Sequence, residues 1–127
     1  MRYFGIIGGG FVGSATALFQ TTNNQCLIWD LDTTKRKPSD LNFDDFLHKS
    51  DIFFICVPTP MLAESGECDT RIVEKVIFQL QSTNKNIYVR STVPIGFCKK
   101  WNVNFIPEFL TEKNWRQDFF NCQNWIL

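Results

Sequence analysis

Three glycine residues near the amino terminus have a spacing that can hold a pyrophosphate. Gly8, Gly10 and Gly13 satisfy the pattern G-x-G-x-x-G, and Phe11 and Val12 lie inside it. Gly8 permits a tight turn, Gly10 leaves the backbone open to a phosphate, and Gly13 lets the following helix pack closely on a strand. That helix would offer free backbone N–H groups and a partial positive charge to the phosphates. The pattern therefore predicts a dinucleotide-binding loop, and the alternative is a glycine-rich turn without a ligand.

An acidic residue stands where the second half of such a fingerprint requires one. Asp30 ends an apolar segment 17 residues beyond Gly13, close to the spacing of about 20 residues expected for this fingerprint. Its carboxylate can accept hydrogen bonds from both ribose hydroxyls and would repel a 2′-phosphate, so the sequence favours NAD over NADP. The basic run at 35–37 leaves a second interpretation open, because its charges could serve a 2′-phosphate. Otherwise it is a solvated loop with one residue at the adenosine edge.

Apolar segments alternate with helical patterns, and these elements must position the two motifs. We expect strands at 3–7, 25–29, 51–57, 86–89 and 103–106, with a further apolar run beginning at 125–127. Helices are expected at 11–20, at 44–49 and from 69 or 70 to about 81. The fold class is therefore α/β, a doubly wound parallel sheet of the Rossmann type in shortened form. We expect residues 1–127 to form a single dinucleotide-binding domain.

Composition excludes two classes of partner. The 13 basic and 13 acidic residues cancel, whereas a nucleic-acid binder needs a basic excess. No apolar run reaches the length of about 18 residues that a membrane span needs, and the amino terminus is too short and glycine-rich for a signal-peptide core.

The five cysteines include no C-x-x-C pair, which fits reduced thiols without a metal in a cytoplasmic protein.

Three proline-containing segments follow the later strands. Cys-Val-Pro-Thr-Pro occupies 56–60, Ser-Thr-Val-Pro-Ile-Gly occupies 91–96, and Pro-Glu-Phe-Leu-Thr-Glu occupies 107–112. Strand exits of this kind lie at the sheet edge where ligands bind in open α/β folds. Together with the glycine loop, Asp30 and the Lys35 that follows it, these segments resemble the NAD-binding domain of the UDP-glucose/GDP-mannose dehydrogenase family. The resemblance covers almost the whole chain, and each motif is modest alone but specific in combination.

The resemblance implies a set of cofactor contacts. The glycine loop would hold the pyrophosphate, Asp30 would bind the adenosine ribose and Lys35 would add a contact there. Residues 57–59 would line the cofactor, and Ser91 and Thr92 would lie near the nicotinamide. The implied cofactor-binding residues are Gly8, Gly10, Phe11, Val12, Gly13, Asp30, Lys35, Val57, Pro58, Thr59, Ser91 and Thr92.

The resemblance also implies a reaction. The family oxidises the primary alcohol of a nucleotide sugar to a carboxylate with two NAD, and a cysteine of a later domain forms covalent intermediates. Thr92 resembles the threonine that helps to position water, and Glu108 and Glu112 resemble two acids, one of which assists thioester hydrolysis. Because Glu112 is one helical turn beyond Glu108, both can face one cleft. The alternative is that Glu108 caps a short helix and Glu112 is solvated.

The chain departs from the family pattern in several places. The segment between Asp30 and Asp51 is short, so one helix-and-strand unit looks trimmed, and Ile106 and Lys113 replace a usual asparagine and glycine. The family's Gly-Gly-x-Cys-Phe-Pro-Lys-Asp segment with its nucleophile is absent, and Cys122 matches nothing. We therefore expect the substrate domain to be missing and the isolated chain to be inactive unless a domain or partner completes it.

Two other functions stay open, and the aromatic residues suggest a partner. The chain could be a non-catalytic NAD- or nucleotide-binding module, or an interaction protein that keeps the fold. Eight aromatic residues crowd the last third of the sequence, between 97 and 125, and an uncovered apolar patch of this kind marks an interface. We therefore expect a homo-oligomer, or a partner that covers this region, in addition to NAD and a nucleotide sugar.

Overall fold

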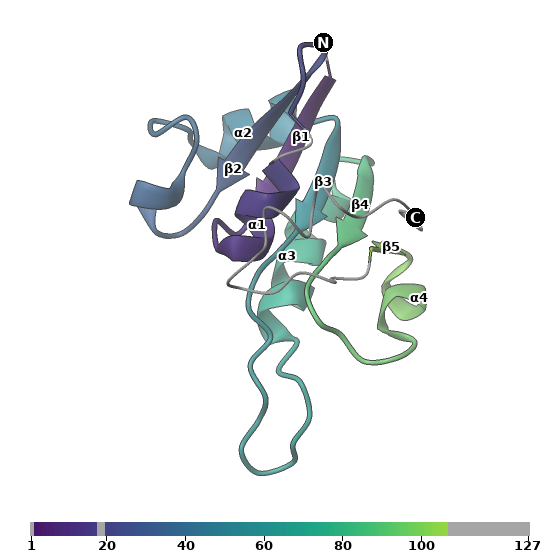
Figure 1. The fold of residues 1–127 in the computed structure, drawn as a ribbon. Helices are drawn as coiled ribbons and strands as arrows, with labels where there is room; N and C mark the ends of the chain where they lie inside the picture. Colours follow the sequence, from purple (N-terminus) through teal and green to yellow (C-terminus); the bar gives the residue numbers. More distant parts are fainter. Residues whose placement is uncertain (1, 18–19, 107–127) are drawn as a thin grey trace.

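A parallel β-sheet is the centre of the fold. Within the described part of the computed structural model, residues 2–17 and 20–106, five strands lie in the order β2-β1-β3-β4-β5 (Figure 1). The strands are β1 (Arg2–Ile7), β2 (Asn24–Trp29), β3 (Ile52–Ile55), β4 (Asn86–Val89) and β5 (Asn104–Phe105). The helices are α1 (Phe11–Thr16), α2 (Phe43–Lys49), α3 (Arg71–Gln81) and α4 (Phe97–Trp101), with the short 3-10 helix η2 (Thr33–Lys35).

The strand order confirms the predicted doubly wound arrangement. The chain moves outward from β1 to β2 and then crosses back to pair β3 with the other side of β1. The order therefore reverses between β1 and β3. In open α/β sheets a ligand binds outside the carboxyl ends of the strands at such a reversal. This geometry sets the place of the candidate site.

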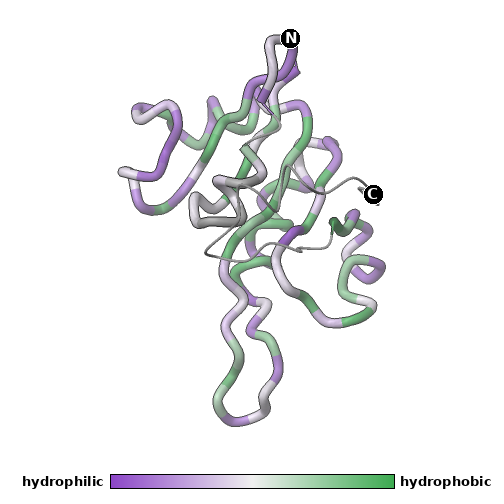
Figure 2. Tube along the Cα trace, viewed as in Figure 1, coloured by the Kyte–Doolittle hydropathy of each residue, from purple (hydrophilic) through white to green (hydrophobic). Residues whose placement is uncertain are grey.

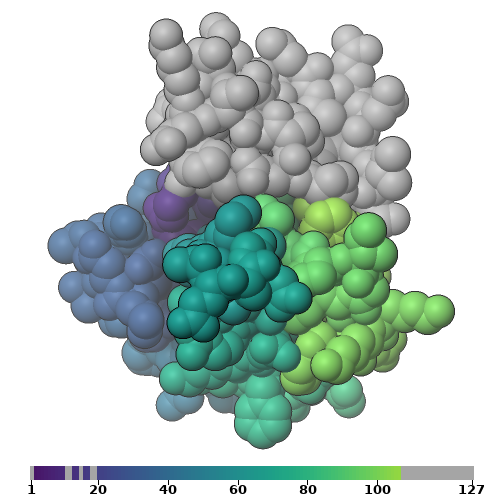
Figure 3. Space-filling model, turned by 90° about the horizontal axis from the view of Figure 1, so that it is seen from below, coloured from purple at the N-terminus to yellow at the C-terminus, as the bar shows by residue number. Residues whose placement is uncertain are grey.

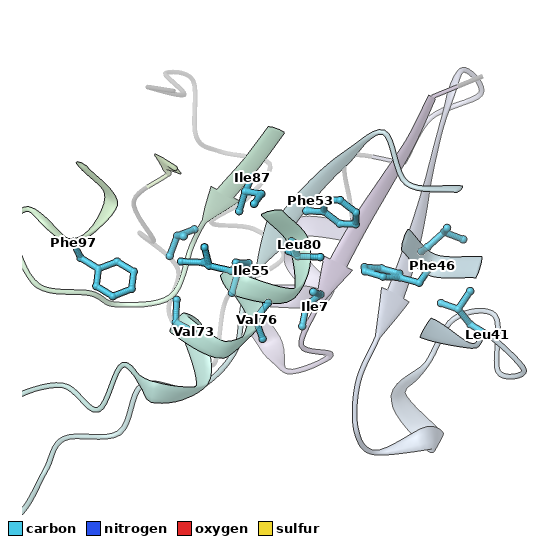
Figure 4. Packing of buried hydrophobic residues seen from close by; sticks show 13 residues of the cluster. Ile7, Leu41, Phe46, Phe53, Ile55, Val73, Val76, Leu80, Ile87 and Phe97 are labelled. Carbon is cyan, nitrogen blue, oxygen red and sulfur yellow. The ribbon is translucent and has the colours of Figure 1, made fainter. Parts of the chain in front are cut away.

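Successive side chains of each strand point to opposite faces of the sheet, and both faces bury apolar residues. On one face, α2 and α3 pack over Ile7, Phe53 and Ile55, with Phe46 entering from α2 and Leu80 from α3 (Figure 4). On the other face, a smaller cluster is formed by Ile6, Ile28, Phe54 and Ile106. The hydropathy colouring shows hydrophobic residues along the strands, whereas the connections mix hydrophilic and hydrophobic stretches (Figure 2).

Helix α3 shows how the sequence pattern becomes a packed element. Its buried residues are Val73, Val76, Ile77 and Leu80, which are spaced as one face of an α-helix requires. The helix begins after Asp69, whose Oδ1 accepts a hydrogen bond from the N–H of Arg71 at 3.1 Å. The apolar Ile72 is not part of this buried face. That side chain is 46% exposed and lies on the neighbouring face of the helix.

The connection between β2 and β3 is short and returns to the edge of the sheet. It contains η2 and α2, and Lys37 pairs with Ile28 through an antiparallel bridge. Lys37 donates to the carbonyl of Ile28 at 3.0 Å, and Ile28 donates to the carbonyl of Lys37 at 2.9 Å. In the described residues, β2 pairs with a strand only on its β1 side. The bridge therefore supplies hydrogen bonds to its outer edge.

The structure differs from the sequence-based expectation in four elements, one of which is β5, with two residues rather than four. Helix α1 ends at Thr16 rather than at 20, and β3 spans four residues rather than seven. Helix α4 had not been expected; it is a short turn bounded by left-handed residues, Gly96 at φ 87° and Asn102 at φ 56°. The apolar run at 125–127 lies outside the described residues.

Candidate functional site

A cavity of about 890 Å³ opens at the carboxyl ends of the strands. Figure 3 views the molecule from that lower end, where the blue, teal and green segments that follow β2, β3 and β4 lie side by side. The volume falls within the range of about 300–1,000 Å³ typical of cofactor sites. The predicted site residues that line this cavity are Gly8, Gly10, Asp30, Lys35, Val57, Pro58, Thr59, Ser91 and Thr92.

A second cavity of similar size, about 930 Å³, lies at the opposite end of the sheet. It is lined by residues at the amino ends of the strands, including Arg2, Asn24, Asp51 and Asn86. None of the predicted cofactor-binding or catalytic residues lines it. Ligand sites of doubly wound sheets occur at the carboxyl ends, so we assign the candidate site to the first cavity.

The glycines of the loop are required for different reasons. A Cβ at Gly8 would lie 2.5 Å from the carbonyl oxygen of Cys56, and the residue has φ of +104°. A Cβ at Gly13 would overlap the carbonyl oxygen of Gly8. By contrast, no described atom lies within 4 Å of a Cβ built on Gly10, which borders the cavity. Contacts within the protein therefore explain why glycine is needed at positions 8 and 13. At Gly10 the absence of a side chain instead leaves space for a ligand. The side chains of Phe11 and Val12 lie outside the described part.

The carboxylate of Asp30 is held beside the glycine loop. Its Oδ2 accepts a hydrogen bond from the N–H of Gly9 at 2.7 Å, and its Oδ1 accepts one from the N–H of Asp32 at 2.8 Å. A carboxylate has about four acceptor positions. Two of them therefore stay available on a side chain that lines the cavity. This arrangement can receive the two hydroxyls of a ribose.

The three basic residues at 35–37 lie in different surroundings in the structure. Lys35 lines the cavity, and its Cβ would lie 2.9 Å from a Cβ on Gly9. The guanidinium of Arg36 instead covers the ring of Trp29, and Lys37 takes part in the bridge at the edge of β2. Only the first of these three residues is among those that line the cavity.

The exits of β3 and β4 are tied together by a hydroxyl. Ser91 is buried, and its Oγ donates to the carbonyl of Val57 at 2.7 Å. The neighbouring Thr92 is exposed and lines the cavity. Ser91 therefore shapes the wall by joining two strand exits, while Thr92 presents its side chain at the opening. Glu108 and Glu112 lie outside the described residues.

Sequence reasoning missed one wall of the cavity. Ile72, Lys75, Val76 and Gln79 of α3 line it at the spacing of a single helix face. The sequence predicts this helix, but its residue pattern does not show which face of the helix lines the cavity. Arg90 was also missed; it lines the cavity and is only 1% exposed, directly before Ser91.

Burial changes the acidity of two described cysteines, Cys26 and Cys98. Burial raises the pKa of the Cys26 thiol to about 11, and it raises the pKa of Cys98 as well. Such thiols stay protonated at neutral pH and make poor nucleophiles. In the described residues no cluster of potential metal ligands occurs, and no helix there is long and apolar enough to cross a membrane.

Comparison with known proteins decides the family. Residues 33–127 match the NAD binding domain of the UDP-glucose/GDP-mannose dehydrogenase family. The chain belongs to this family. The predicted resemblance, the fold class and the NAD cofactor are thereby confirmed. The match begins after the glycine loop and Asp30, so the geometry of those residues adds independent support.

Two relatives show how much of a complete dehydrogenase the chain covers. The UDP-glucose 6-dehydrogenase of Campylobacter jejuni is 29% identical over 143 aligned positions, which include 84% of this chain and 36% of that protein. The crystal structure of a ternary complex of GDP-mannose dehydrogenase from Pseudomonas aeruginosa superimposes with a TM-score of 0.76 at 22% identity, over 94% of this chain and 38% of that one. The chain therefore spans a little over a third of the length of both.

Proposed function

We propose that this NAD-binding domain serves a nucleotide-sugar 6-dehydrogenase that oxidises the primary alcohol of the sugar. The observation that carries the proposal is the open backbone of Gly10 beside the held carboxylate of Asp30, at the reversal of strand order. The similarity to a UDP-glucose 6-dehydrogenase supports a nucleotide sugar as substrate. Because the chain covers only a little over a third of that relative, the complete reaction requires a further domain or a partner.

The proposed cofactor contacts follow from the geometry of the cavity. The backbone at Gly8, Gly10 and Gly13 and the start of α1, with Phe11 and Val12, approaches the pyrophosphate. Asp30 accepts hydrogen bonds from the adenosine ribose, with Lys35 beside it. The far wall is then made of Val57, Pro58, Thr59, Ser91 and Thr92.

The proposed chemical roles concern the exits of the last strands. NAD, when bound, accepts a hydride from the sugar carbon. Thr92 is exposed at the opening of the cavity, where its hydroxyl can hold a water molecule near the reacting carbon. We assign Glu108 and Glu112 to the acid–base steps, with one of them assisting hydrolysis of the thioester. Arg90 is buried beside this wall and lines the cavity.

We propose that the nucleophilic cysteine comes from a further domain or a partner. The raised pKa values of Cys26 and Cys98 argue against either thiol. Of the aromatic residues between 97 and 125, Phe97 is buried in the core and Trp101 packs against it, whereas Phe105 is 41% exposed and would meet that partner or a second copy of the chain. A cytoplasmic location is the corresponding proposal, because Cys26, Cys68 and Cys98 form no disulfide and disulfides are rare in that compartment.

Calorimetric titration of the full chain with NAD tests the proposed cofactor contacts. We expect NAD to bind, and Asp30→Asn to weaken binding by about tenfold, because hydrogen bonds to a charged acceptor contribute about 1.5–3 kcal/mol. Asp40→Asn is the matched control, since Asp40 is an exposed carboxylate on the same connection. No heat from NAD with the unaltered chain would overturn the proposal. If the Asp30→Asn variant bound NAD as tightly as the unaltered chain, the assignment of the ribose to Asp30 would be refuted.

A further inference from the structure

Arg36 is held against the strand end that carries Asp30. Its guanidinium carbon lies 3.8 Å from the centre of the Trp29 ring, and its Nε donates to the carbonyl oxygen of Asp30 at 2.8 Å. The side chain is half-buried. A guanidinium stacked on an indole ring and hydrogen-bonded at one edge is fixed in both position and orientation.

Trp29 is itself fixed by the hydrophobic core. Its ring lies 5.3 Å from that of Phe43, centre to centre, and Phe43 stacks on the buried Phe46 of α2 at 6.2 Å. Trp29 and Phe43 also line the cofactor cavity, whereas Arg36 is not among its lining residues. The stack therefore places the guanidinium on the outside of the indole and keeps it out of the cavity.

The position of Arg36 matters because its guanidinium could bind a phosphate. A guanidinium binds a phosphate through two parallel hydrogen bonds, and it is the side chain best suited to that task. In dinucleotide-binding folds, an arginine near the ribose accommodates the 2′-phosphate of NADP, while an acid in that place selects NAD. Arg36 is hydrogen-bonded to the backbone carbonyl of Asp30, the residue whose carboxylate we assign to the ribose. Once released from Trp29, this long side chain can therefore turn toward the same ribose.

We propose that Trp29 is a determinant of cofactor specificity because it holds Arg36 away from the 2′-position of the adenosine ribose. The proposal rests on the assignment of that ribose to Asp30. Two features would then disfavour NADP. One is the negative charge of Asp30, and the other is the position of Arg36, the side chain of the basic run best suited to bind phosphate, outside the cavity. Trp29 thus acts through Arg36, as a positioning residue.

The test compares the ratio of the NADP and NAD dissociation constants in three variants of the full chain. Trp29→Leu frees Arg36, and we expect the ratio to fall by about tenfold, since one added hydrogen-bonded charge pair strengthens NADP binding by about that factor. Trp29→Leu combined with Arg36→Gln should restore the ratio of the unaltered chain, because no guanidinium is left to release. Arg36→Gln alone should not lower the ratio. A merely structural role of Trp29 would weaken both cofactors and leave the ratio unchanged in every variant.

Arg36→Lys keeps the proposal testable if Trp29→Leu does not fold. Lysine keeps the charge but lacks the planar group that stacks on Trp29, so its ammonium can turn toward the 2′-phosphate. We expect NADP to gain several-fold relative to NAD in Arg36→Lys and to gain nothing in Arg36→Gln. Equal ratios in these two variants would refute the role of Arg36. Absence of NAD binding by the unaltered chain would instead refute the proposed cofactor site.

Discussion

A matched pair of glycine substitutions separates ligand binding from folding at the phosphate loop. Gly10→Ala adds a methyl group to open space at the edge of the cavity, and the residue does not have positive φ. Gly13→Ala adds the same group against the carbonyl oxygen of Gly8. We expect the first variant to fold and lose NAD affinity, and the second to lose stability.

The expected magnitudes follow from the atoms involved. If the methyl group at Gly10 prevents one backbone hydrogen bond to a phosphate, about 1.5–3 kcal/mol is lost, which corresponds to NAD binding weaker by about 10- to 150-fold. Loss of glycine before α1 costs folding about 1 kcal/mol or less. Overpacking at Gly13 costs about 1–3 kcal/mol. We expect the upper end there, because the atom in contact is backbone and the adjoining turn at Gly8 is constrained by Cys56.

Thermal unfolding and calorimetry distinguish the two effects. For a domain of 127 residues, each kcal/mol shifts Tm by about 4 °C. Gly13→Ala should therefore lower Tm by about 12 °C, whereas Gly10→Ala should lower it by no more than about 4 °C. NAD titration of Gly10→Ala should show the loss of affinity at a temperature where its circular dichroism equals that of the unaltered chain. Full NAD affinity of Gly10→Ala would refute the assignment of the pyrophosphate to this loop.

The remaining predictions concern the cavity wall, acid stability, a buried thiol and turnover. Ser91→Ala should lower stability by about 1–3 kcal/mol in urea unfolding, because it leaves the carbonyl of Val57 without its 2.7 Å donor; an unchanged midpoint would contradict this. The hydrogen bonds from Arg71 lower the pKa of Asp69 to about 2, so this pair stabilises the fold above the unfolded pKa of about 3.9 and ceases to do so as the pH falls toward 2. Asp69→Asn should accordingly flatten the acid-unfolding curve between those values, and an identical curve would count against the pair. Cys26, with its pKa of about 11, should be alkylated by iodoacetamide slowly at pH 8 and faster near pH 11, as mass spectrometry of the labelled peptide can show; rapid labelling at pH 8 would exclude the burial effect. The chain alone, mixed with UDP-glucose and NAD, should give no sustained NADH absorbance, and steady turnover would show that a nucleophile is present within it.

The strands and the long helix were predictable because their signals are local. Apolar runs such as 52–55 can form buried strands, and the spacing of Val73, Val76, Ile77 and Leu80 fits one helix face. Helix α4 gave no such signal. It is five residues long, and its ends depend on left-handed backbone at Gly96 and Asn102. Neither the length nor the conformation of such a turn is visible in a hydrophobic pattern.

The site was predictable only where the chemistry lies in consecutive residues. The glycine loop and the strand exits could be recognised because a turn and a phosphate contact impose residue types directly. The wall from α3 could not, since Ile72, Lys75 and Gln79 enter the cavity only through the angle at which the helix packs. The basic run is the clearest case. Its three charges are equivalent in the sequence, yet a stack on Trp29 and a bridge to Ile28 give them separate roles.

The contact between Gly9 and Asp30 joins the two parts of the cofactor site into one unit. The N–H of Gly9 is bound to the Asp30 carboxylate at 2.7 Å, and the stem of Lys35 occupies the space where a side chain of residue 9 would lie. The glycine loop after β1 and the turn after β2, which we propose bind the pyrophosphate and the ribose, are therefore coupled. Because Arg36 binds the backbone carbonyl of Asp30, its influence extends through Asp30 to the glycine loop. A substitution that releases this turn should consequently weaken pyrophosphate and ribose contacts together, while only the freed charge of Arg36 distinguishes NADP from NAD.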